Sequence, residues 1–258
     1  MARQPRFWLK GRNDDMATAD NMSKSIVKPT VCPACGKLFD YKMYPMIHIP
    51  GDNKLRKKIL NKTLFFPKCP FCGEEFKLKA NCFYRDDIRR ELIVVLEKPD
   101  KKLERMLMQN NLPLNDLGID ERMADFIKAI FKRRIVYNVD SFREKILVFD
   151  SNYDDRIIEL MKCSLSHLLE KDNHMPVYRI FLEESSGNQL LFAAIMGSKP
   201  PFEYVTAKTP SSAYSYYRDK YLNKLGEPQD DKYIFCDQKW ASESGLLEGE
   251  DEGFVIPL

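Results

Sequence analysis

The segments CPACG (32–36) and CPFCG (69–73) each place two cysteines three positions apart and follow the second cysteine with a glycine. The two intervening residues form a tight turn in which both sulfurs point at one centre, and the glycine permits the backbone to turn back. Two such knuckles supply a closed tetrahedral set of thiolates. We therefore predict one structural zinc ion bound by four ligands: Cys32, Cys35, Cys69 and Cys72.

Two other chemistries use similar cysteine motifs. A thioredoxin-type redox site needs one C-x-x-C motif, whereas this chain carries two. An iron–sulfur cluster also uses four thiolates, but the doubled CPxCG knuckle favours zinc. With four protein ligands no coordination position remains open for water, which indicates a structural rather than a catalytic ion.

The residues around the two knuckles predict a small zinc ribbon over 28–98, after a disordered tail over 1–27. Apolar residues alternate from Phe39 to Ile49, which predicts a strand with one buried face. Asp52 is placed to cap a short helix over 53–61, inserted between the knuckles, with Leu55 and Ile59 on its inner face. The segment ELIVVLE (91–97) predicts a further strand.

This region resembles the CpXC domain, a bacterial zinc-ribbon family. The resemblance covers roughly 30–97 and rests on CPACG, LRKKIL (55–60), CPFCG, FYRD (83–86) and ELIVV (91–95). It extends to segments that commonly follow this domain: RRIV (133–136), EKILVFD (144–150) and DDRIIELMK (154–162). The stretch NCFYRD (81–86) departs from the family pattern without touching the four cysteines. The resemblance implies a zinc-ribbon fold and a bacterial source, and it implies no particular activity.

The remainder, 99–240, predicts a helical connector followed by a mixed α/β domain, so the fold class is α+β. We expect helices around 103–108, from Met123 to Phe131, after a capping box of Ser141 and Glu144, and over 154–170. Strands are expected over 135–139, 177–183, 189–196, 202–206 and 232–236. A helix is expected from Thr209-Pro210 to Gly226. Residues 241–258 carry five acidic residues and no Lys or Arg, and are expected to form an acidic tail.

Composition and cysteine usage indicate a cytoplasmic protein that does not engage membranes. The chain is 44% hydrophobic and 31% charged, and its apolar runs are far shorter than the roughly 20 residues that span a bilayer. The N-terminus lacks the apolar core of a secretory signal, and Met22 is a second candidate start. Seven cysteines, four of them in paired motifs, indicate metal binding in a reducing compartment rather than disulfides.

Charge is unevenly distributed: residues 22–90 hold 15 Lys/Arg against 6 Asp/Glu. A basic helix within this region is a candidate nucleic-acid-binding face: Lys54, Arg56, Lys57, Lys58 and Lys62. The alternative is local charge balance, because Zn²⁺ and four thiolates leave two negative charges that nearby lysines would offset.

Other candidate functional residues have simpler structural explanations. Cys163 and His167 are spaced i, i+4 on a predicted helix, but nearby carboxylates discourage a thiolate, so we do not expect a nucleophile. His48 alternates off the buried strand face and is expected to be exposed. Three tyrosines of the last helix have the spacing of core residues: Tyr214, Tyr217 and Tyr221. Tyr216 lies off that face and is expected at the surface.

The sequence thus predicts a zinc-binding, non-catalytic interaction protein whose partner is another protein. A nucleic-acid-binding regulator is the second reading, and an enzyme of unknown chemistry is the third. The chain contains no phosphate loop, dinucleotide motif, HExxH motif or GxSxG elbow, and this lowers the enzyme reading.

Overall fold

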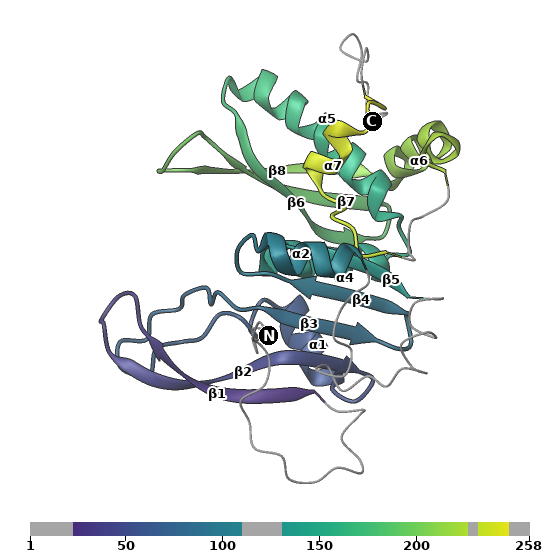
Figure 1. Cartoon of the computed structure of the whole chain (residues 1–258). Coiled ribbons are helices and arrows are strands. Elements are labelled where there is room, and N and C mark those ends of the chain that lie inside the picture. Colours follow the sequence, from purple (N-terminus) through teal and green to yellow (C-terminus); the bar gives the residue numbers. More distant parts are fainter. Residues whose placement is uncertain (1–22, 110–130, 227–231, 248–258) are drawn as a thin grey trace. The chain divides into compact units, whose positions relative to one another are not determined.

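The computed structural model describes residues 23–109, 131–226 and 232–247, which fall into two compact units (Figure 1). The first unit runs to Val139 and includes a later return, Gln229–Ile234. The second comprises Asp140–Pro228 and Phe235–Leu258. Both helices and strands are present, and the fold class is α+β, as predicted. No helix among the described residues is long and apolar enough to cross a membrane.

The first unit is built on a five-stranded mixed sheet. Its strands lie side by side in chain order: β1 (Lys24–Val31), β2 (Leu38–Ile49), β3 (Cys82–Asp86), β4 (Glu91–Val95) and β5 (Lys132–Val136). The β1–β2 and β3–β4 pairs are antiparallel, and the β2–β3 and β4–β5 pairs are parallel. Parallel neighbours require long connections. The β2–β3 connection contains the second cysteine knuckle, and this connection positions the cysteine group described below.

The helix predicted between the knuckles is α1 (Asn53–Leu60), which lies behind the sheet in Figure 1. Leu55 and Ile59 are buried, as the spacing predicted. Asp52 precedes the helix but does not cap it with its side chain, and its carboxylate accepts a hydrogen bond from the Ser23 amide at 3.3 Å. The helix expected around 103–108 is confirmed as α2 (Lys101–Met108), whose first amides are capped by Asp100. The helix expected from Met123 lies outside the described residues.

Three expectations for the first unit are corrected. Residues 24–27 were assigned to a disordered tail, but they belong to β1, where Ile26 pairs with Met43. The expected division near residue 98 differs from the observed one at Val139, because β5 pairs with β4 and joins the first sheet. The segment 232–236 is not a full strand and makes only a bridge, in which the Ile135 amide donates to the Ile234 carbonyl at 2.9 Å.

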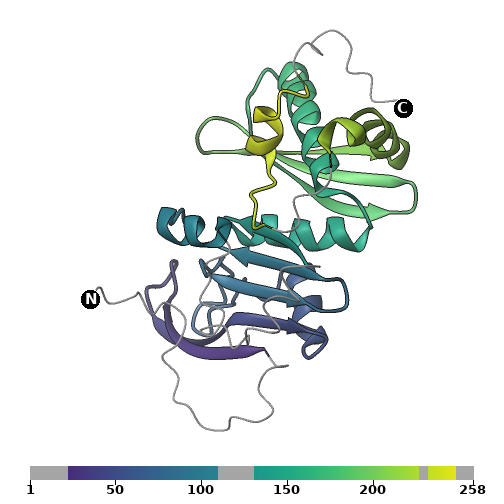
Figure 2. The ribbon, with the colours of Figure 1, turned by 45° about the vertical axis from the view of Figure 1, so that its right-hand side comes forward.

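The described part of the second unit combines a three-stranded antiparallel sheet with helices (Figure 2). The strands are β6 (Val177–Ser186), β7 (Gln189–Met196) and β8 (Glu203–Pro210), and β7 is central. The helices are α4 (Val139–Asp150), α5 (Asp155–Asn173), α6 (Ser211–Leu225) and α7 (Gln238–Glu243). The predicted β6–β7 hairpin is confirmed, and its turn contains Gly187 at φ 55°. The long helix α5 packs against β6, α6 and α7.

The expected capping box, the expected start of the helix at Thr209-Pro210 and the expected start of the tail at residue 241 differ from the structure. The capping box is wrong, because α4 already begins at Val139 and Glu144 is buried within the helix. Pro210 ends β8 and precedes α6 without a side-chain cap, whereas the predicted stop at Gly226 is confirmed. The expected acidic tail begins inside α7, where Ala241 is buried.

Five ionisable side chains of α4 and α5 form a buried network. Lys145 contacts Asp155 at 3.1 Å and Glu159 at 2.9 Å. Lys162 contacts Glu144 and Glu159, both at 2.9 Å. Buried charges persist only when they are paired and hydrogen-bonded. The two lysines bridge three carboxylates, and Glu144 also accepts the Leu182 amide of β6 at 2.7 Å.

Candidate metal centre

The first knuckle is the turn of the β1–β2 hairpin. The strands remain paired as far as Val31 and Leu38, and the six residues between them form the turn. The Gly36 amide donates to the Cys32 carbonyl at 2.9 Å, and the Cys32 amide donates to the Lys37 carbonyl at 3.0 Å. Gly36 has a φ of 69°, and a Cβ added to it would meet nothing within 4 Å. The glycine is therefore required for its left-handed backbone and not for space.

The second knuckle repeats this hydrogen-bond pattern in the connection between α1 and β3. The Gly73 amide donates to the Cys69 carbonyl at 2.9 Å, and the Cys69 amide donates to the Glu74 carbonyl at 2.8 Å. Gly73 has a φ of 78°. The chain on either side forms a narrow arm, 64–80, closed by a bridge between Lys68 and Glu75. Both CPxCG segments therefore fold alike, as their sequence identity predicts.

The four sulfurs converge from these two knuckles. The sulfur atoms of Cys32 and Cys72 lie 3.7 Å apart, and those of Cys35 and Cys69 also lie 3.7 Å apart. All four lie within 4.8 Å of one another. A tetrahedron with metal–sulfur distances of about 2.3 Å has sulfur–sulfur edges of about 3.8 Å. The four predicted cysteines are thus brought together in a group that could hold a metal ion.

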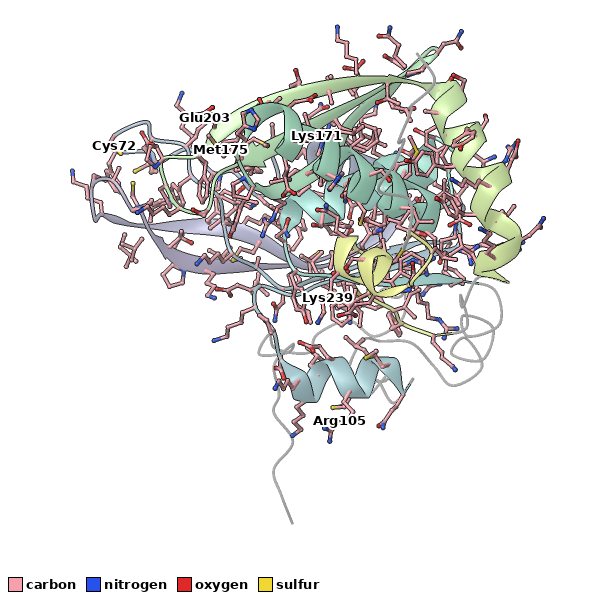
Figure 3. All side chains as sticks on the ribbon, turned by 90° about the horizontal axis from the view of Figure 1, so that it is seen from above. Cys72, Arg105, Lys171, Met175, Glu203 and Lys239 are labelled. Carbon is pink, nitrogen blue, oxygen red and sulfur yellow. The ribbon has the colours of Figure 1, made fainter. Side chains whose placement is uncertain are left out.

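The close sulfur pairs each join one knuckle to the other. An ion in this position would therefore tie the end of the β1–β2 hairpin to the end of arm 64–80. Cys32 and Cys69 are buried, while Cys35 and Cys72 are exposed. Figure 3 shows Cys72 at the outer end of the hairpin, beside further sulfur atoms.

Other contacts between hairpin and arm support the same geometry. The rings of Phe39 and Phe76 meet edge to face, with centroids 6.3 Å apart. The Tyr41 hydroxyl donates to the Leu64 carbonyl at 3.0 Å. Lys37 places its ammonium 4.9 Å from the centroid of the Phe71 ring. The sequence alone did not reveal these pairings, because alternation shows which side of a strand is buried but not what covers it.

The thiols perturb one another strongly. Desolvation raises the pKa of Cys69, but hydrogen bonds from the backbone at Cys72 and Phe71 outweigh it and lower this pKa to about 6. A backbone hydrogen bond at Glu74 lowers the pKa of Cys72, but desolvation and the three neighbouring thiols outweigh it and raise this pKa to about 12. Crowded thiols resist joint ionisation, and a bound cation removes that resistance.

The other three cysteines lie apart from this group. Burial raises the pKa of the Cys82 thiol, and Cys236 is buried. Burial, with Glu159 nearby, raises the pKa of Cys163 to about 12. The Cys163 thiol donates to the Gln238 carbonyl at 3.4 Å. A thiol held in this way is a poor nucleophile.

The basic helix exposes fewer cationic side chains to solvent than its sequence suggests. Lys54, Lys57 and Lys58 are exposed on α1, as is Lys62. The side chain of Arg56 is only 13% exposed and lies 3.7 Å from the buried carboxylate of Asp86. Arg56 therefore pairs with a buried carboxylate of the first unit rather than pointing into solvent.

The expectation that His48 is exposed is wrong, because its side chain is buried. It is 4% exposed, and its Nε2 lies 2.7 Å from an Asp87 carboxylate oxygen. Arg85 pairs with the same carboxylate. The expectation for the tyrosines of α6 holds, because Tyr216 is exposed while Tyr214, Tyr217 and Tyr221 are buried.

Comparison with known proteins gives one match. No curated protein and no solved structure matches the chain. The family described as CpXC protein matches residues 30–162, from the end of β1 to Lys162 in α5, and so includes both cysteine knuckles. Because this match covers more than half of the 258 residues, the chain belongs to the CpXC protein family.

Proposed function

We propose that the protein binds one zinc ion through Cys32, Cys35, Cys69 and Cys72 and uses it to hold a non-catalytic interaction module. The observation that carries the proposal is the convergence of four thiols, with 3.7 Å between the sulfurs of each cross-knuckle pair. Four thiolates at this spacing suit a single tetrahedral ion. An iron–sulfur cluster spreads its cysteine ligands over two or more iron atoms, so its four cysteine sulfurs would not all lie within 4.8 Å of one another, as they do here.

The role of the zinc is structural. Four thiolates complete its tetrahedral coordination, so no position is open for a substrate or an activated water. Structural zinc contributes roughly 10–16 kcal/mol of binding energy to folding in small zinc domains. Here that energy would add to the contacts that already join the end of the β1–β2 hairpin to the arm 64–80. We propose no catalytic residue.

A protein partner is favoured by the apolar surface next to the cysteines. Val31, Leu38 and Phe71 are 58%, 60% and 54% exposed. They come from both sides of the metal centre, and each neighbours a ligand or a knuckle turn in sequence. Exposed apolar residues that cluster are a mark of interaction sites, whereas scattered ones are not. The proposed compartment is the cytoplasm, where seven cysteines without disulfides stay reduced.

Elemental analysis of the purified full-length protein tests the zinc assignment. We expect one zinc per chain, and loss of zinc on Cys32→Ser or Cys72→Ser, one ligand from each knuckle. Cys82→Ser, Cys163→Ser and Cys236→Ser are the matched controls and should leave zinc content unchanged. Iron in place of zinc, or two metals per chain, would show that the assignment is wrong.

Nucleic-acid binding is the second candidate, favoured by the exposed lysines of α1. Each phosphate contact adds a slope of about −0.9 to the dependence of log affinity on log salt for duplex DNA. If α1 binds phosphates, Lys57→Glu/Lys58→Glu should weaken duplex binding and flatten this slope. If the lysines only balance charge, the variant should match the parent protein. An enzyme of unknown chemistry remains third, with no described group that favours it.

A further inference from the structure

The first unit contains a pocket of about 400 Å³ beside the metal-binding arms. One wall is the β1–β2 hairpin, represented by Ile26, Lys28, Met43 and Pro45. The opposite wall is the chain that returns from the second knuckle, residues 79–81. The segment that follows β4 completes the lining. Pockets of roughly 300–1,000 Å³ accommodate small organic ligands.

The pocket lining combines apolar and polar surface, and a ligand would cover the part of the apolar surface that is exposed. Leu96 and Ala80 belong to the lining but are already buried, so the apolar surface left to cover comes from other residues. Met43 and Pro45 add apolar surface from β2. Ile26 remains 42% exposed at the pocket although it lies within a strand. Covering apolar surface of this kind is favourable by roughly 25 cal/mol per Å², so an apolar body fits here better than a small hydrophilic ion.

The charged groups of the lining favour an anion. Lys28, Lys79 and Lys98 are exposed, and none of them forms an ion pair with any residue in the described parts of the chain. The lining also contains Asp100 and Glu97. Asp100 is already engaged, because its carboxylate accepts the amides of the first turn of α2. Three lysines against two carboxylates leave an excess of one positive charge around the opening.

We infer that this pocket binds a small organic anion whose body is apolar, such as an aromatic or aliphatic carboxylate. The apolar body covers Ile26, Met43 and Pro45, and the anionic group meets the lysines at the rim. This inference goes beyond the zinc site, which has no open coordination position.

The pocket also depends on the metal centre, and this part rests on the proposed function. The hairpin wall leads to Cys32 and Cys35, and the returning wall leads from Cys69 and Cys72. An ion at the four sulfurs fixes the outer ends of both walls. Removal of the ion frees the walls to separate and weakens binding.

Methyl NMR titration of the zinc-loaded full-length protein tests the inference with two matched probes. One probe is 1-naphthoate and the other is 1-naphthamide, which keeps the ring and lacks the charge. We expect shifts at the methyls of Ile26, Met43 and Leu96, and at least fivefold tighter binding of the carboxylate. A triple variant, Lys28→Gln/Lys79→Gln/Lys98→Gln, should reduce this preference below twofold. The control triple on α1, Lys54→Gln/Lys57→Gln/Lys58→Gln, should preserve it.

Equal binding of the two probes would overturn the inference, as would shifts confined to methyls outside the pocket. Zinc content is measured on the same samples, so the two claims fail separately. One zinc per chain with no naphthoate binding contradicts the pocket alone. Pocket binding in a protein that holds no zinc contradicts the zinc assignment and the dependence on the metal, and leaves the pocket itself supported. Chelation should weaken naphthoate at least tenfold, and unchanged affinity would refute the dependence on the metal.

Discussion

At the scale of single residues, the four cysteines that converge were predictable from the sequence, because each knuckle is a local structure. The CPxCG sequence contains its own turn: the cysteine carbonyl accepts the glycine amide, and the glycine supplies a positive φ. The pairing of Cys32 with Cys72 was not predictable, since it depends on how two distant arms pack. The fold of each knuckle can therefore be predicted from the sequence, whereas the pairing of cysteines from different knuckles cannot.

The glycine of the first knuckle gives a direct residue-scale prediction. Gly36→Ala places a Cβ in a left-handed conformation, which costs about 1–2 kcal/mol. Because nothing lies within 4 Å of that Cβ, no clash adds to the cost. Zinc affinity should fall by roughly 5- to 30-fold in chelator competition. Gly36→Asn should lose less, because asparagine tolerates this conformation.

The matched control is Gly187→Ala, at the β6–β7 turn of the second unit, where φ is also positive. It should cost stability but leave zinc affinity unchanged. A larger loss of zinc affinity at Gly187 than at Gly36 would contradict this account of the knuckle.

At the scale of elements, the sequence predicted helices and strands that bury one face and expose the other. It did not predict the strand whose residues are nearly all exposed. Strand β2 alternates between exposed and less exposed positions, and α1 buries Leu55 and Ile59, so both were found. Strand β1 is an edge strand exposed along most of its length, so no alternation marks it. His48 was misplaced because β2 pairs in parallel with β3, and sheets at such positions are covered on both faces.

Helix α4 shows how a local motif can mislead. Ser141 and Glu144 match a capping box, yet the Glu144 carboxylate holds Lys162 of α5 and the Leu182 amide of β6. A buried tertiary partner has replaced the local one. No sequence period distinguishes a glutamate that caps its own helix from one that pairs with a lysine of another helix.

The buried network predicts a large effect for one lysine. Lys162→Met leaves Glu144 and Glu159 without their shared cation, and removing one partner of a buried pair costs about 3–5 kcal/mol. Urea unfolding followed by circular dichroism should show this loss. The control is Lys171→Met on the exposed end of the same helix (Figure 3), which should change stability by less than about 0.5 kcal/mol. Equal effects of the two variants would contradict the network.

The same network predicts the direction of an alkaline effect. Burial lowers the pKa of Lys145, but attraction to Asp155 outweighs it and raises this pKa well above 10.5. Burial also lowers the pKa of Lys162, but Glu144 outweighs it and raises this pKa above 10.5. The stabilisation is present below 10.5, and it is lost as pH rises through the folded-state values, because the unfolded chain releases its protons first.

Unfolding free energies measured across pH 9 to 12 should therefore decline for the parent protein. In Lys162→Met the decline should be shallower, because one of the two raised lysines is gone. A steeper decline in the variant would contradict the assignment.

At the scale of the whole molecule, the boundary between the units was hidden from the sequence. The polar composition after residue 98 resembles a linker, yet β5 returns to pair with β4 across a long connection. Such pairing joins residues far apart in the chain, and no local signal records it. The match to the CpXC family spans both units, since it covers 30–162 and the division falls at Val139.

Metal removal should affect the two units differently. All four cysteines belong to the first unit. Chelation should speed amide hydrogen exchange in β1, in the outer part of β2 and in the arm 64–80. Exchange in α5 and β7 of the second unit should stay within about twofold of the zinc-loaded protein. Uniform acceleration across both units would show that the ion supports the whole chain rather than two arms.

X-ray absorption at the zinc edge of the purified protein is the measurement that bears most directly on the proposed metal centre. The four converging thiols predict a single shell of four sulfur atoms at about 2.3 Å, with no nitrogen or oxygen ligand. Cys35→Ser should replace one sulfur by a lighter atom or empty the site. A zinc shell that mixes sulfur with nitrogen or oxygen in the parent protein would contradict the structural four-thiolate site.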